Sequence, residues 1–242
     1  MKAQSVGVGF HLIDLPQGNS MVSNPFQSGS NLVSDLFTEV PDGFSVSKLV
    51  DGVWIANAWS ADSSTWSNPL MSLTPGEGAR VDSPAAYQWF TFGKPLVGSL
   101  NNFVPQGESA RGSRLAAGGL ISTDLGFNPP SGTTVGGINL DGTVENPAIF
   151  VDGLWLPAEP NISVGQAVII NSPEAVDWEQ NFAVEGIENP LSFAQQPGDL
   201  ALAEGGALTL SAEAIGAENI TYQWQLNGND IPGATGSVLT ID

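Results

Sequence analysis

Hydrophobic residues alternate with polar or small ones along much of the chain, for example in residues 6–10 and 44–49. This two-residue period is typical of half-buried β-strands. Asp-Gly dipeptides at 51–52 and 152–153 separate such segments and predict tight hairpin turns, because glycine accepts a positive φ freely and aspartate tolerates one. The sequence shows no capped apolar stripe of helical period, so we expect an all-β protein with a helical turn only near residues 32–37.

The chain also contains an internal repeat. Residues 73–84 align with residues 162–173, and Trp89 aligns with Trp178, both at a spacing of 89 residues. The shared Gly, Ser-Pro and Trp positions indicate that one unit is used twice.

A second match has a different spacing. Residues 50–54 match residues 151–155 at a spacing of 101, and Leu15 with its neighbours resembles Leu115 with its neighbours at a spacing of 100. The change of spacing predicts about 12 extra residues in the first copy, within the Ser/Trp/Asn-rich segment 58–69.

We therefore interpret residues 5–95 and 112–187 as two related β-sandwich-like modules. The segments 15–25 and 75–84 resemble parts of a module that precedes immunoglobulin-like domains in large secreted bacterial surface proteins. This resemblance implies an extracellular or cell-surface location, and it implies no particular chemical activity.

The last part of the chain, residues 190–242, has a different character. It contains the blocks Tyr222-Gln223-Trp224 and Ile231-Pro232-Gly233-Ala234-Thr235, and it resembles bacterial immunoglobulin-like domains. The resemblance implies a β-sandwich in which Trp224 packs between two sheets, with Leu210 facing it.

The family's Asp-x-Gly-x-Tyr segment, which forms a late strand of the sandwich, is not reached before Asp242. We therefore expect a truncated immunoglobulin-like sandwich, produced by cutting of a longer chain or completed by a strand from another chain. Val6, Val8 and Phe10 lie in a segment suited to such strand donation. The alternative, which we favour, is that this segment is the first strand of the first module.

Composition excludes several classes of function. Six Lys and Arg residues against 25 Asp and Glu residues give a net charge of -19, which disfavours nucleic-acid binding and docking to anionic membranes. Without cysteine there are no disulfides or thiolate metal sites, and with His11 as the single histidine there is no multi-histidine zinc site. No run of about 18 apolar residues predicts a membrane span.

Catalytic chemistry has little support in the sequence. Paired carboxylates serve glycosidases, but among 25 acidic residues some pair is always close, and His11 lacks an accompanying G-x-S-x-G motif. We predict no enzymatic activity and no cofactor. Calcium is a weak candidate at 139–142 and 227–230, where ordinary Asx turns are the favoured explanation.

Tryptophan offers the best candidate contact surface. Trp54, Trp89, Trp155 and Trp178 recur in both copies and are expected to be structural. Trp59 and Trp66 lie in the expected insertion among Ser, Thr and Asn residues, so we select them as candidate contacts to a glycan or a partner. The alternative is that these two indoles cover a small core.

The sequence thus favours a non-enzymatic structural or adhesive component of the bacterial cell surface or of an extracellular, filament-like assembly. Its expected partners are further copies of itself or other surface proteins. The uneven charge supports head-to-tail contact, because all six basic residues lie within residues 1–114. The second hypothesis is a carbohydrate-binding accessory module.

Overall fold

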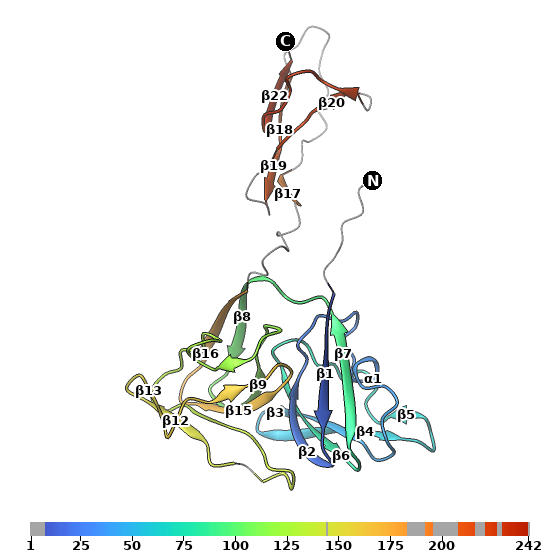
Figure 1. The fold of residues 1–242 in the computed structure, drawn as a ribbon, viewed down its shortest axis with the longest axis vertical. Coiled ribbons are helices and arrows are strands. Elements are labelled where there is room, and N and C mark those ends of the chain that lie inside the picture. The colour runs from blue at the N-terminus through green and yellow to red at the C-terminus, as the bar shows by residue number, and fades with distance from the viewer. Residues whose placement is uncertain are drawn as a thin grey trace. The chain divides into compact units, whose positions relative to one another are not determined.

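A computed structural model describes residues 8–143, 145–182, 192–195, 208–215, 221–226 and 229–241. They belong to two compact units, one within Ser5–Phe182 and one formed mainly by Ala183–Asp242. Both units consist of antiparallel β-sheets (Figure 1), which confirms the all-β prediction. The one helix of the described ranges, α1 (Val33–Leu36), has four residues and lies where a helical turn was predicted. None of the described helical structure is long and apolar enough to cross a membrane.

In the first half of the larger unit, β1 (Gly9–Leu15) pairs with β7 (Tyr87–Gly93). A five-stranded sheet lies beside this pair. Its strands, in spatial order, are β2 (Gly18–Ser23), β6 (Gly78–Ser83), β3 (Ser45–Val50), β4 (Val53–Ser60) and β5 (Thr65–Trp66).

The second half repeats this arrangement. The pair is β8 (Gly98–Val104) with β16 (Val176–Phe182). The five-stranded sheet has the spatial order β9 (Gly107–Gly112), β15 (Ala167–Ser172), β11 (Thr134–Gly136), β12 (Ala148–Val151) and β13 (Leu154–Leu156). The short strands β10 (Gly119–Leu120) and β14 (Asn161–Ile162) form a further pair.

Strand registers repeat at the spacing of 89 residues that the sequence indicated. Gly9 lies opposite Gly93, and Gly98 lies opposite Phe182. The second copy of the strand pattern therefore begins at β8, before the expected start at residue 112. At this spacing the residue equivalent to Leu15 is Val104. The strand pairing therefore shows that the alignment of Leu15 with Leu115 was wrong.

The two Asp-Gly hairpins are both present but occupy different places. Asp51 and Gly52 have positive φ, as do Asp152 and Gly153, which is the geometry of a type I′ turn. The first turn joins β3 to β4 near the middle of its sheet, and the second joins β12 to β13 at the sheet edge. The spacing of 101 residues thus matches two similar turns that join non-equivalent strands. The 12-residue insertion that we expected in the first copy is therefore not needed to align the two halves.

Each half has its own hydrophobic core around a fully buried tryptophan. The indole N–H of Trp89 donates to the Leu36 carbonyl at 2.8 Å, and that of Trp178 donates to the Leu125 carbonyl at 2.7 Å. The acceptors are also 89 residues apart. Phe37 stacks on Trp89 with ring centroids 4.5 Å apart, so the repeat extends to the packing of the cores.

The two halves pack against each other through β2, β6, β9 and β15. The Ser23 N–H donates to the Gly165 carbonyl at 2.8 Å, and the Gly112 N–H donates to the Gly76 carbonyl at 3.1 Å. Gly112 is equivalent to Ser23, and Gly76 is equivalent to Gly165, so the second bond is the counterpart of the first. A small apolar cluster fills the contact, formed by Met21, Ala110, Ala167 and Ile169.

The described residues of the smaller unit form three strand pairs: β17 (Ser192–Gln195) with β19 (Glu213–Ile215), β18 (Leu208–Ser211) with β22 (Val238–Ile241), and β20 (Gln225–Leu226) with β21 (Asn229–Asp230). The two blocks that carry the immunoglobulin-like resemblance are hydrogen-bonded to each other, since the Trp224 N–H donates to the Ala234 carbonyl at 3.0 Å. The assignment of this unit to the immunoglobulin-like class stays a prediction.

Candidate functional site

Trp59 and Trp66 face each other across β4 and β5. Their ring centroids are 5.8 Å apart at an interplanar angle of 56°. Trp66 is 6% exposed and belongs to the first core, whereas Trp59 is half-buried against that core. The equivalent pair in the second half, Phe150 and Trp155, has centroids 5.1 Å apart at 57°. The pair is therefore a repeated cover of the core, as the alternative expectation had it, and Trp59 is the more exposed of the two indoles.

A surface hollow of about 420 Å³ lies beside this pair. Trp59 and Trp66 are the tryptophans of its lining, which also includes the polar residues Ser34, Thr38, Glu39 and Ser64; these four residues are called its rim. We call it the Trp59 hollow. Its volume is in the range of small-molecule binding sites, and an apolar wall with a few polar groups is typical of them.

Two residues on the rim have strained backbone conformations. Glu39 has φ 54° and Ser64 has φ 51°, a left-handed conformation that side chains other than glycine rarely adopt. Such residues concentrate at binding sites, where the surrounding structure imposes them. Both residues are exposed, and the Ser64 hydroxyl donates to the Ala61 carbonyl at 3.4 Å.

Tyr87 lies behind the same rim. Its hydroxyl donates to the Thr38 carbonyl at 2.8 Å. Partial burial, together with the negative charge of Glu39, raises the pKa of Tyr87 above its ordinary value. The phenol therefore remains protonated at neutral pH and continues to hold the segment that carries Thr38 and Glu39.

The indole N–H of Trp59 is a further polar group. The N–H groups of Trp89, Trp155 and Trp178 each donate to an internal acceptor. Within the described residues the Trp59 N–H has no such acceptor. The residues that line the hollow therefore combine aromatic rings with hydroxyl, indole N–H and carboxylate groups.

The sequence identified the two tryptophans but not the polar rim. Ser34, Thr38 and Glu39 follow or belong to α1, whereas Ser64 precedes β5, and no local motif connects the two segments. Only the packing of the α1 region against the β4–β5 hairpin brings them together. The one sequence signal for the polar rim was segment 58–69, which is rich in turn-forming residues such as Ser and Asp.

The other selected residues have structural positions. Phe10 lies on β1, which pairs with β7 of its own module, so this part of the chain has the arrangement we favoured over strand donation. Val8 is described only as exposed, and Val6 lies outside the described residues. Trp224 and Leu210 are each half-buried, and Leu210 lies opposite Leu239. Their proposed contact in an immunoglobulin-like core stays a prediction.

The calcium candidate at residues 139–142 shows an internal hydrogen-bond arrangement. The Asp141 carboxylate accepts hydrogen bonds from the Thr143 N–H at 2.9 Å and from its hydroxyl at 2.6 Å, and these bonds lower the pKa of Asp141. In the described part of the chain, no three acidic or histidine side chains are grouped in a way that could hold a metal ion. The second candidate, 227–230, lies partly outside the described residues.

Comparison with known proteins connects part of the chain to a glucan hydrolase. The chain is 31% identical over 131 residues to Endoglucanase C of Cellulomonas fimi, an alignment that covers 47% of this chain and 12% of that protein. The chain thus spans about an eighth of the length of this relative. No family model and no solved structure matches the chain. The similarity relates it to a segment of a bacterial endoglucanase.

Proposed function

We propose that this protein is a non-catalytic, extracellular carbohydrate-binding module that takes a neutral glucan in the Trp59 hollow. The observation that carries the proposal is the half-buried Trp59 indole in a hollow that is also lined by Ser, Thr and Glu residues. The apolar face of a sugar ring stacks on an indole, and its hydroxyl groups exchange hydrogen bonds with such a rim. The similarity to a segment of an endoglucanase supports both the ligand class and the extracellular location.

The charge of the protein favours an uncharged ligand. The chain carries a net charge of -19, and the one carboxylate on the rim is Glu39. Acidic polysaccharides and phosphate-containing ligands would be repelled, whereas the hydroxyl groups of a neutral sugar can donate hydrogen bonds to Glu39. We therefore expect glucans to bind with little dependence on salt.

The test is a titration of the whole chain with cellohexaose, followed by tryptophan fluorescence and calorimetry. The Trp59→Ala variant should bind about five- to thirtyfold more weakly, because one sugar–indole contact contributes about 1–2 kcal/mol, as other aromatic contacts do. Glu39→Gln should weaken binding by a smaller factor, because it retains an acceptor but removes the charge.

Trp54→Ala is the matched control. Trp54 is also half-buried, but it lies outside the hollow, with the Arg80 guanidinium 4.9 Å from its ring. Its removal should leave cellohexaose binding unchanged. Equal losses in the Trp54 and Trp59 variants, or no binding by the unaltered protein, would contradict the proposal.

A structural role in an extracellular assembly is the second candidate, and one observation favours it. The edge strand β13 exposes Leu154 and Leu156, and Ile149 beside them on β12 is also exposed. Exposed apolar edge strands are sites of strand pairing between chains. If this edge mediates assembly, Leu154→Lys should abolish concentration-dependent light scattering and any ordered polymers seen by electron microscopy. A monomer at all concentrations would rule this role out.

A further inference from the structure

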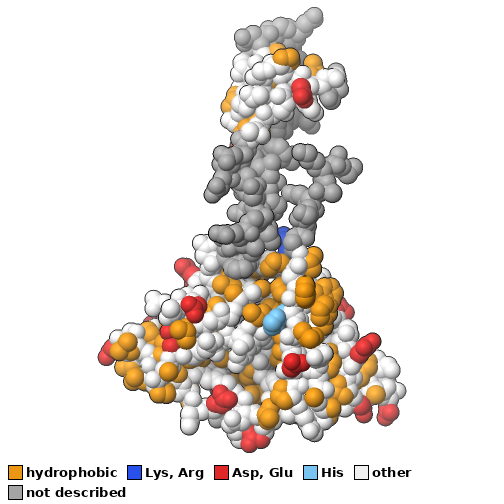
Figure 2. Space-filling model, in the orientation of Figure 1, with side chains coloured by type: hydrophobic (Ala, Val, Ile, Leu, Met, Phe, Trp, Pro, Cys, Tyr) orange, Lys and Arg blue, Asp and Glu red, His pale blue; other side chains and the backbone are white. Residues whose placement is uncertain are grey.

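Five apolar side chains cover the outer face of the β1–β7 pair: Val8, Phe10, Leu12, Phe90 and Phe92. Their exposed fractions lie between 50% and 73%. Figure 2 shows hydrophobic side chains gathered over these two strands, beside the single histidine. Isolated apolar residues are common on protein surfaces, but a contiguous group of this kind marks an interaction site. We call this group the β1–β7 face.

The rings on the β1–β7 face form a shallow platform. Phe10 lies opposite Phe92 in the strand register, and Leu12 lies opposite Phe90. The Phe90 ring centroid is 6.3 Å from that of Phe10 and 5.8 Å from that of Phe92. The ring planes are tilted by 33° and 31° to each other, so the three rings form one contiguous aromatic group without an edge-to-face pair.

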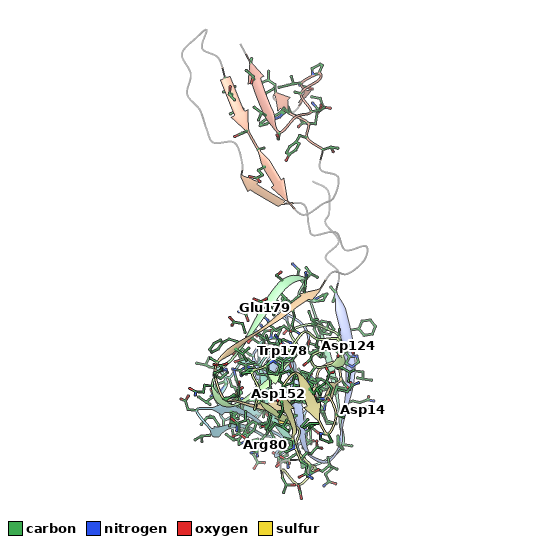
Figure 3. All side chains as sticks on the ribbon, turned by 90° about the vertical axis from the view of Figure 1, so that its left-hand side faces the viewer. Asp14, Arg80, Asp124, Asp152, Trp178 and Glu179 are labelled. Carbon is green, nitrogen blue, oxygen red and sulfur yellow. The ribbon has the colours of Figure 1, made fainter. Side chains whose placement is uncertain are left out.

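The repeat shows that this surface is not required for folding. In the second half, Ser99 lies opposite Asn181 and Asn101 lies opposite Glu179, and all four side chains are exposed. Figure 3 shows Glu179 on the outside of β16, whereas the neighbouring Trp178 lies in the interior. The same strand pair thus folds with polar residues at the positions that are aromatic or leucine in the first half.

Polar groups border the platform on two sides. At one end of the strands, the Gln88 amide donates to the Asp14 carboxylate at 3.0 Å, next to a hollow of about 530 Å³. Another hollow of about 350 Å³ includes Phe90 and Phe92 in its lining and contains Asp35 and Lys94. A ligand that covers the rings can therefore form hydrogen bonds beyond them.

We infer that the β1–β7 face binds the flat side of a neutral glucan chain and is a second contact surface, separate from the Trp59 hollow. The inference rests on the proposed function for its ligand class. The C–H side of a sugar ring is apolar and matches a flat aromatic surface, while the hydroxyl groups along its edge match the Asp14–Gln88 pair. A second copy of the chain is a poorer occupant, because it would bring together two chains that each carry a charge of -19.

Two surfaces on one molecule have a consequence for affinity. A soluble oligosaccharide can occupy either surface alone, whereas an insoluble polysaccharide presents many chains and can engage both surfaces together. Simultaneous contact makes the second binding step intramolecular and strengthens attachment to the solid. Loss of the β1–β7 face should therefore affect binding to insoluble glucan far more than binding of a short soluble chain at Trp59.

The decisive variant transfers a residue pair from the second half to the first. Phe10→Ser together with Phe92→Asn introduces the Ser99–Asn181 pair, which this strand pair already accommodates. Adsorption to microcrystalline cellulose should weaken by at least about tenfold, while the fluorescence titration of Trp59 with cellohexaose stays unchanged. The reverse transfer, Ser99→Phe with Asn181→Phe, should strengthen adsorption. Phe103→Ser, which removes an isolated exposed Phe, is the control and should have no effect.

Each result decides the inference. Unchanged adsorption of the Phe10/Phe92 variant overturns it, even if the Trp59 hollow binds cellohexaose. A dimer of the unaltered protein that becomes a monomer in this variant also overturns it, because a second copy is then the occupant. Adsorption that depends on Phe10 and Phe92 without any cellohexaose binding at Trp59 supports the face and contradicts the proposed site. If the unaltered protein does not adsorb to cellulose, the inference about the β1–β7 face is overturned, and the cellohexaose titration decides the Trp59 hollow separately.

Discussion

Ser23 donates its backbone N–H to the Gly165 carbonyl, and the two residues equivalent to them, Gly112 and Gly76, form the same bond in the reverse sense. The isolated bridges Val22–Gln166 and Glu77–Arg111 are related in the same way. The two halves therefore contact each other through one patch used twice, as the subunits of a two-fold symmetric dimer do. The duplicated sequence behaves as a dimer joined within one chain.

Gly112 and Ser23 meet close to this pseudo-two-fold axis, and they are equivalent residues. A Cβ added at Gly112 would lie 2.2 Å from the Ser23 Cβ, well inside van der Waals contact. Gly112→Ala should therefore destabilise the larger unit by about 1–3 kcal/mol in urea unfolding. Adding Ser23→Gly should recover at least about half of this loss, because it removes the atoms that clash.

Gly29→Ala is the control for that experiment, since a Cβ there meets nothing within 4 Å. Its effect on the free energy of unfolding should stay within about 0.5 kcal/mol. If the double variant were no more stable than Gly112→Ala alone, close packing at the axis would not be the cause.

Trp89 and Trp178 should have equal energetic roles. Each indole is fully buried and donates one hydrogen bond to a carbonyl at the equivalent position. Trp→Phe at either site should cost about 2–4 kcal/mol, mainly from lost packing, since the Leu125 carbonyl keeps a hydrogen bond from the Gln180 amide at 3.2 Å whereas the Leu36 carbonyl loses its indole donor. Separate urea unfolding curves of the two variants test this. A cost of less than about 1 kcal/mol at one site would show that the two cores are not energetically equivalent.

Glu77 links stability to acid pH. Burial raises the pKa of Glu77, but hydrogen bonds from the Lys48 ammonium and the Thr74 backbone, with the charge of Lys48, lower this pKa by more, to below 4.5. A carboxylate with a lowered pKa stabilises the fold fully above its unfolded pKa and loses this effect as the pH falls through its folded pKa. Glu77→Gln should therefore cost about 0.5–1 kcal/mol at pH 7, and this difference should disappear as the pH falls through the lowered pKa of Glu77.

The repeat supplies a control for the acid effect. Gln166 occupies the equivalent position and accepts the same type of bond from the Ser163 N–H at 3.0 Å, but the residue equivalent to Lys48 is Gly137. Gln166→Glu should therefore not stabilise the protein at neutral pH. A gain in the free energy of unfolding for this variant would show that the turn, and not the lysine, lowers the pKa of Glu77.

Substitutions in the two Asp-Gly turns can measure the cost of backbone strain separately from any effect on side-chain packing. Gly52 has φ 76° and Gly153 has φ 86°, and an added Cβ would meet nothing within 4 Å at either position. Alanine at each should therefore cost only the left-handed strain, about 1 kcal/mol. Differential scanning calorimetry of the two variants should show similar decreases in the unfolding temperature. A much larger effect at Gly52 would mean that the central hairpin folds as a critical element.

The fold class and the repeat were predictable from local patterns. Alternation of hydrophobic and polar residues indicated strands, and the Asp-Gly pairs indicated type I′ turns. The aligned Trp89 and Trp178 indicated equivalent cores. Each of these signals depends on residues that are close in the chain or on a short sequence block that occurs in both copies. The alignment failed between these blocks, where it matched Trp54 with Trp155. In the strand register, the equivalent of Trp155 is Trp66. An Asp-Gly pair is common in tight hairpin turns, so the motif alone does not specify which two strands the turn connects.

The candidate surfaces depended on tertiary structure. The sequence alone determined that the chain forms antiparallel β-modules, carries a strongly acidic surface and contains no cysteine. It did not determine that Glu39 and Ser64 share one hollow with Trp59, or that Phe10 shares one face with Phe90 and Phe92. The first group depends on the packing of the α1 region against the β4–β5 hairpin. The second depends on the hydrogen-bond register between β1 and β7, where a shift of one residue would turn each side chain to the opposite face of the sheet.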